Sequence, residues 1–195
     1  TLGRTLAAAW PLNLPAQFVT VGLCSVAATV AFGIIFTLGY GGYTHTLFLR
    51  ALQAHGLPLH VLAGLGGWLT FTAMGVSHRL LAMFMLSPEL DGAPTRWTLR
   101  LGTLALAIVI IAGPVAIAAR GNPDLALLIA GLISLACLAL YARDVVQLYR
   151  KRVRRVIELN SRMAGIALAH LAAATLLTIA LAALGLFGRY GGALV

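Results

Sequence analysis

The sequence predicts an all-α fold, a polytopic membrane helical bundle with about five transmembrane helices. Of its 195 residues, 61% are hydrophobic and 10% are charged, whereas a soluble domain is roughly half apolar and about a quarter charged. Five apolar segments reach the length of about 20 residues that a helix needs to cross a bilayer. We place these spans in a single domain of residues 1–195, at 16–40, 59–86, 99–119, 124–149 and 162–187.

Proline and glycine mark the connections around the second span. Pro58 stands directly before the span at 59–86, in a position where helices tolerate proline. Before it, residues Thr44–Ala54 are expected to form a short helix on the membrane surface or to extend that span. Residues Ser87–Thr98 contain two prolines and a glycine, and they alone read as a real loop.

Proline also marks the third and fourth spans. Gly113-Pro114 falls late in the third span, where the missing N–H of proline should kink the helix. Asn122-Pro123 predicts a tight hairpin, with Asn122 capping the fourth helix. An arginine-rich turn at Arg150–Arg155 then leads to the last span.

The basic residues predict the orientation, because cytoplasmic loops are enriched in lysine and arginine. If the Arg150–Arg155 loop is cytoplasmic, alternation of the spans leaves three of the 14 basic residues outside, namely Arg50, Arg120 and Arg189. The others are Arg4, Arg79, Arg96, Arg100, Arg143, Arg150, Lys151, Arg152, Arg154, Arg155 and Arg162. This asymmetry supports the span count and predicts a multi-pass protein of the bacterial inner membrane.

The same pattern argues against several other classes of protein. A formal charge of +9 would suggest nucleic acid in a soluble protein, but basic residues at span ends indicate the lipid bilayer and other membrane subunits as partners. Cys24 and Cys137 lie inside apolar segments and are expected to pack rather than to bind metal. The carboxylates, Asp144 among them, fall at span ends or in loops, so no carboxylate pair, proton relay or complete catalytic constellation is expected.

The chain starts without methionine and stops in an apolar stretch, so we expect a piece of a longer protein.

Three histidines in the spans are the best candidates for chemistry. His60 and His78 share a helix face but stand about 27 Å apart, so they cannot bind one metal ion. Alternating topology brings His78 and His170 to a similar depth, which a bis-histidine b-type heme inside a bundle would need. His60, near the outer surface, could hold a heme there. The competing interpretation is that all three histidines hydrogen-bond to a neighbouring helix or reach the interface.

The second span also carries a family resemblance. It contains Leu59-His60, then Gly67-Trp68, then the run GVSHRLLAMF at 75–84. This pattern resembles a helix of uncharacterised bacterial membrane proteins related to the catalytic subunit, subunit I, of heme-copper oxidases, and Tyr141–Gly185 is similar to a later stretch of that group. The resemblance covers roughly half of the chain. It implies a bundle that binds b-type heme, with His60 at the family's histidine position, in or beside a respiratory electron-transfer complex.

The chain departs from that family at three positions. His78 stands where the family has tyrosine, Ala82 replaces a proline, and Pro58 occupies the place of a second histidine. Five spans cannot assemble an oxygen-reducing centre, so either the rest is missing or the protein is a non-catalytic relative. Two alternatives stay open: a cofactor-free structural or assembly subunit, and a copper-handling membrane protein, which the start at Leu59-His60 also resembles.

Overall fold

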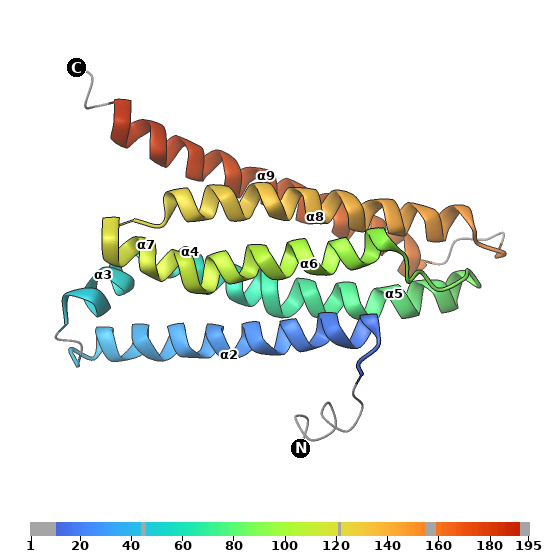
Figure 1. Ribbon diagram of the computed structural model, residues 1–195, viewed down its shortest axis with the longest axis horizontal. Coiled ribbons are helices and arrows are strands. Elements are labelled where there is room, and N and C mark those ends of the chain that lie inside the picture. Colours follow the sequence, from blue (N-terminus) through green and yellow to red (C-terminus); the bar gives the residue numbers. More distant parts are fainter. Residues whose placement is uncertain (1–10, 44–45, 121, 155–158, 192–195) are drawn as a thin grey trace.

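The computed structural model describes residues 11–43, 46–120, 122–154 and 159–191. Within these residues there is no strand, and five helical spans are long and apolar enough to cross a membrane. They run side by side in an elongated bundle (Figure 1). Their limits are Leu14–Tyr40, Leu57–Met85, Ala93–Ala119, Asp124–Arg150 and Leu159–Gly185. The predicted all-α membrane bundle is confirmed, whereas Arg4 and Arg155 lie outside the described residues.

Three of the spans are continuous α-helices, and the other two each consist of three helical segments. The first is α2 (Leu14–Tyr40), the fourth α8 (Asp124–Arg150) and the last α9 (Leu159–Gly191). The second consists of α4 (Leu57–Val61), the π-helix η1 (Leu62–Phe71) and α5 (Thr72–Met85), and the third of α6 (Ala93–Ala107), the π-helix η2 (Ile108–Ala112) and α7 (Gly113–Arg120). A short helix, α3 (Leu47–His55), connects the first two spans, and its bounds are close to those predicted for a short helix at 44–54.

Local sequence explains where these helices begin and where they change pitch. The Asn13 side chain accepts a hydrogen bond from the backbone N–H of Ala16 at 3.0 Å and so caps α2. The third span begins at Ala93 rather than 99, because Pro94 fits the first helical turn, where its missing N–H costs nothing. The expected loop Ser87–Thr98 is therefore shorter than predicted. Pro114 cannot donate to the carbonyl four residues earlier, and the widened turn of η2 lies directly before it.

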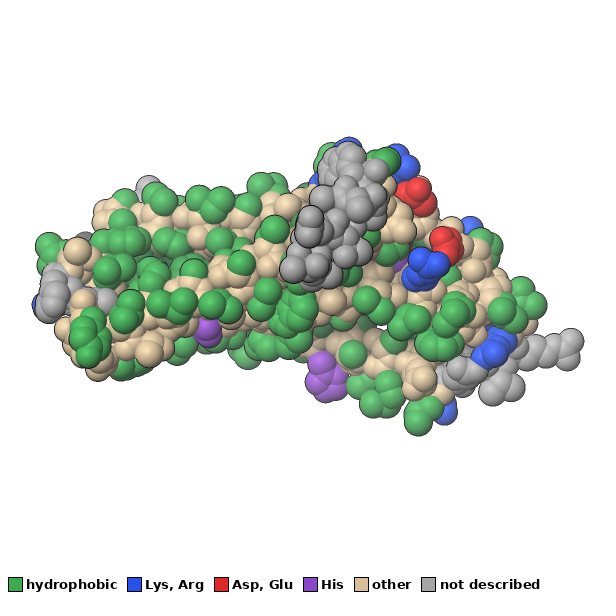
Figure 2. Space-filling model, turned by 90° about the horizontal axis from the view of Figure 1, so that it is seen from below, with side chains coloured by type: hydrophobic (Ala, Val, Ile, Leu, Met, Phe, Trp, Pro, Cys, Tyr) green, Lys and Arg blue, Asp and Glu red, His purple; other side chains and the backbone are tan. Residues whose placement is uncertain are grey.

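Apolar contacts hold the bundle together along its length. Three buried clusters centre on Leu59, Phe71 and Leu148. We call the end at which α5 and α8 end and α6 and α9 begin the basic end, because most of the lysine and arginine side chains visible in Figure 2 gather there. The last span is the least covered: 6% of its most apolar window is buried, against 22–33% for the other four. It packs mainly on α8.

Candidate functional site

Polar side chains from three spans meet inside the bundle near its basic end. Helix α5 contributes Ser77 and His78, α6 contributes Thr95, and α8 contributes Tyr141 and Asp144. We call these five residues the polar cluster. His78, Thr95 and Asp144 are 5%, 1% and 2% exposed. Because ionisable side chains inside a membrane span are costly and usually functional, the polar cluster is the candidate site.

Thr95 and Asp144 form the best-defined contact of the polar cluster. The Thr95 hydroxyl donates a hydrogen bond to Oδ2 of Asp144 across the α6–α8 interface, at 2.7 Å. Asp144 lies near the end of its span, as expected, about two helical turns before Arg150, but it is buried and faces the bundle interior. The sequence does carry a signal for this burial, since Tyr141, Val145 and Leu148 place the apolar stripe of α8 on the same face.

His78 occupies the centre of the polar cluster. Its ring meets the edge of Tyr141, with ring centroids 5.5 Å apart, and Phe18 of α2 lies on another side at 5.5 Å. Asp144 lies one helical turn beyond Tyr141 on the same face of α8. The Nε2 atom of His78 is buried and has no hydrogen-bond partner among the described residues. A buried nitrogen without a partner is rare in native proteins and calls for an explanation such as a water, an ion or a catalytic role.

Tyr141 and Ser77 add a second hydroxyl pair beside the histidine. Their oxygen atoms lie 2.6 Å apart. Because Ser77 donates its single hydrogen to the Met74 carbonyl at 2.8 Å, the Tyr141 hydroxyl is the donor to Ser77. The polar cluster therefore contains a carboxylate, an imidazole and three hydroxyls within one region of the bundle, which is the chemistry of a proton relay.

The three histidines predicted as ligands face different neighbours. His60 is half-buried between α4 and α2, with Nδ1 3.1 Å from the Thr29 carbonyl oxygen. His78 faces Phe18 and Tyr141, whereas His170 is exposed and its Nδ1 lies 2.9 Å from the carbonyl of Ile166 in its own helix. His78 and His170 make no contact with each other in the described part of the chain, and a heme held between them stays a prediction.

Metal binding finds no other support in the described part of the chain. There, no group of three or more histidine, cysteine, aspartate or glutamate side chains could hold a metal ion. Cys137 is buried and its thiol donates to the Thr98 carbonyl at 3.2 Å, whereas Cys24 is exposed on α2. Both cysteines are free thiols, and of the two only Cys137 is packed inside the bundle.

Comparison with known proteins adds no relative. No family model matches this chain, and no curated protein and no solved structure matches it. The resemblance to heme-copper oxidase subunit I therefore stays a prediction. The polar cluster has to be interpreted from its own geometry.

Proposed function

We propose that this chain is an integral membrane subunit that loads protons at the polar cluster, with His78 as the proton carrier and Asp144 as its countercharge. One observation carries the proposal: a 2%-exposed carboxylate inside a membrane span lies one helical turn from Tyr141, whose ring contacts a buried histidine with no partner for its Nε2 among the described residues. Chains of aspartate and histidine at such depth are typical of proton relays in pumps and transporters. Imidazole suits the task because its charge ordinarily changes between about pH 5 and 8.

The surroundings support exchange with one side of the membrane. The polar cluster lies near the basic end, whereas the buried clusters around Phe71 and Leu59, toward the other end, are apolar. Within the described part of the chain, His78 Nε2 makes no hydrogen bond that would continue toward the other end of the bundle. We therefore infer a site that takes up protons from the basic side, expected to be cytoplasmic, and passes them to a partner in the membrane.

Nuclear magnetic resonance of protein labelled with ¹⁵N-histidine tests this proposal. We expect the His78 signal, assigned with a His78→Gln variant, to titrate reversibly and to respond to Asp144→Asn. The matched control is Asp91→Asn, because Asp91 lies near the same end with a side chain 68% exposed and pairs with Arg96. A His78 signal that never titrates, or that behaves identically in the two variants, would contradict the proposal and favour the cofactor-free structural subunit.

A second candidate is the heme-binding electron-transfer subunit that the family resemblance implies, and the environment of His60 favours it. If Nδ1–H donates to the Thr29 carbonyl, Nε2 is free, and metal-bound histidines are commonly oriented in this way. If bound, heme would be held by His60 and would supply one-electron transfer. A reduced-minus-oxidised optical spectrum tests this: a b-type band lost in His60→Ala supports it, whereas a missing band, or one that survives His60→Ala, contradicts it. The variants His78→Ala and His170→Ala belong in the same series, since the sequence predicts all three as ligands.

A further inference from the structure

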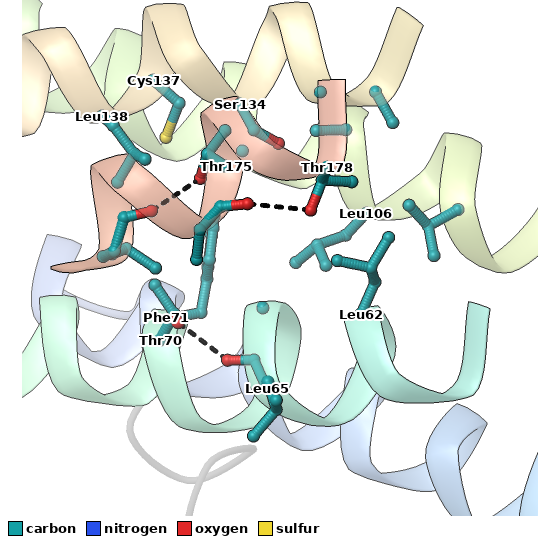
Figure 3. A pocket seen from close by; sticks show the side chains of 18 of the residues that line it. Leu62, Leu65, Thr70, Phe71, Leu106, Ser134, Cys137, Leu138, Thr175 and Thr178 are labelled. Carbon is teal, nitrogen blue, oxygen red and sulfur yellow. Dashed lines mark hydrogen bonds between the residues drawn. The ribbon is translucent and has the colours of Figure 1, made fainter. Parts of the chain in front are cut away.

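The middle of the bundle contains a cavity of about 350 Å³ between η1, α6, η2, α8 and α9 (Figure 3). Its walls are aliphatic or small, with Leu62, Leu65, Phe71, Leu106 and Leu138 among them, and none of its lining residues is charged. The volume lies within the range of roughly 300–1,000 Å³ that small-molecule sites occupy. It also exceeds that of an apolar cavity of about 150 Å³ that stays dry and takes up small apolar molecules.

The cavity opens toward the bilayer because α9 packs mainly on α8 rather than on η1. Two residues of its lining, Leu65 of η1 and Leu177 of α9, are 57% and 59% exposed. Gly66, also in the lining, has no atom within 4 Å of where a Cβ would stand. A lipophilic molecule can therefore enter between η1 and α9 without crossing the polar cluster.

One polar group in the cavity wall lacks a partner. The hydroxyls of Thr70, Thr175 and Thr178 donate to carbonyl oxygens of their own helices at 2.7–2.9 Å. Ser134 of α8 makes no such bond with the described residues, although it lines the same space (Figure 3). A hydroxyl far from water gains from any acceptor that reaches it. The spare donor favours a ligand that carries one acceptor oxygen.

We propose that this cavity binds a neutral lipophilic molecule that enters from the bilayer and accepts a hydrogen bond from Ser134. The uncharged walls exclude a charged headgroup, and the spare donor selects a carbonyl or ether oxygen over a bare hydrocarbon chain. The site is separate from the polar cluster and does not rest on proton loading.

Photolabelling of the full chain in vesicles with an alkylated benzophenone tests the proposal, since this neutral ketone is both lipophilic and an acceptor. We expect mass spectrometry to find the label on η1 and α9 at the cavity. Gly66→Leu should fill the cavity and abolish that labelling, whereas Gly165→Leu, which adds the same side chain at an exposed position with open space around it, should not. Ser134→Ala should weaken labelling about fivefold, as for one lost hydrogen bond, and Thr103→Val, which removes a hydroxyl outside the cavity, should leave it unchanged.

Three results would overturn the proposal. Labelling spread over all bilayer-facing residues in proportion to exposure would mean that the cavity holds nothing specific. Equal labelling of the two leucine variants would place the probe elsewhere. If Gly66→Leu lowers labelling but Ser134→Ala does not, the cavity takes up plain hydrocarbon chains and the hydrogen-bonded ligand is wrong. Circular dichroism and gel filtration of every variant separate these results from misfolding.

Discussion

Replacement of Thr95 by valine tests whether the polar cluster contributes to stability through a defined hydrogen bond. Valine has nearly the shape of threonine, so the packing of α6 against α8 is kept while the donor to Asp144 Oδ2 is lost. Both partners are almost fully buried, at 1% and 2% exposure, so water cannot replace the missing hydroxyl. The substitution therefore leaves a carboxylate oxygen without its donor inside the bundle.

The size of the effect follows from two bounds. Hydrogen bonds between helices in membranes average about 0.6 kcal/mol, with a maximum near 1.7. Hydrogen bonds to charged groups are worth about 1.5–3 kcal/mol, and a buried group left without a partner costs about 1–3 kcal/mol. Since the Thr95–Asp144 bond is short and buried, we expect a loss of about 1.5–1.7 kcal/mol, where the two ranges overlap.

Equilibrium unfolding in mixed micelles with increasing SDS, followed by tryptophan fluorescence, measures this loss. Thr103→Val is the matched control: Thr103 is also on α6, but its hydroxyl donates to the Leu99 carbonyl of its own helix, so a change within about 0.5 kcal/mol is expected. A double-mutant cycle with Asp144→Ala isolates the pairwise free energy. Equal stabilities of Thr95→Val and Thr103→Val, or fully additive effects in the cycle, would refute the interaction.

Three further predictions concern packing and orientation. Tyr141→Phe removes the hydroxyl that pairs with Ser77 but keeps the ring against His78, so the same unfolding assay should show a loss of about 1 kcal/mol. Gly75→Ala would place a Cβ 2.7 Å from a backbone carbonyl of α2 and should cost about 1–3 kcal/mol, whereas Gly165→Ala, which meets open space, should not destabilise. Arg152→Cys in a cysteine-free background should resist an impermeant thiol reagent in intact cells and react in inverted vesicles; labelling from outside would reverse the proposed topology.

Much of the fold was predictable because a bilayer imposes a length and a composition on each span. The predicted spans 16–40 and 124–149 agree closely with α2 and α8. The start of the third span was predicted six residues too late, because Pro94 was taken as a helix breaker. Position within the helix decides whether proline is tolerated, and Pro94 lies in the first turn. The two π-helices could not be predicted, since apolar periodicity does not report a change of helical pitch.

The candidate site was less predictable, because burial in a bundle depends on which helix faces which. His78 was singled out correctly as a residue at depth, but its partners on α6 and α8 come from segments distant in sequence. Asp144 was set aside because it falls near a span end, although a position two turns inside a helix can face either lipid or protein. The spacing of Tyr141, Asp144 and Leu148, which places all three on one face of α8, was the better guide to the burial of Asp144.

The polar cluster depends on residues with no polar role, and α2 is the clearest case. Phe18 is fully buried and packs on both Phe71 and His78, with ring centroids 5.4 and 5.5 Å apart. Gly75 permits this close approach, because a Cβ there would stand 2.8 Å from the Cβ of Phe18. Helix α2 thus separates His78 from lipid on one side, while Tyr141 covers it on another. The contact between α2 and α5 therefore stabilises the bundle and also excludes water from the polar cluster. In such a dry environment, charges interact over a longer distance than in water.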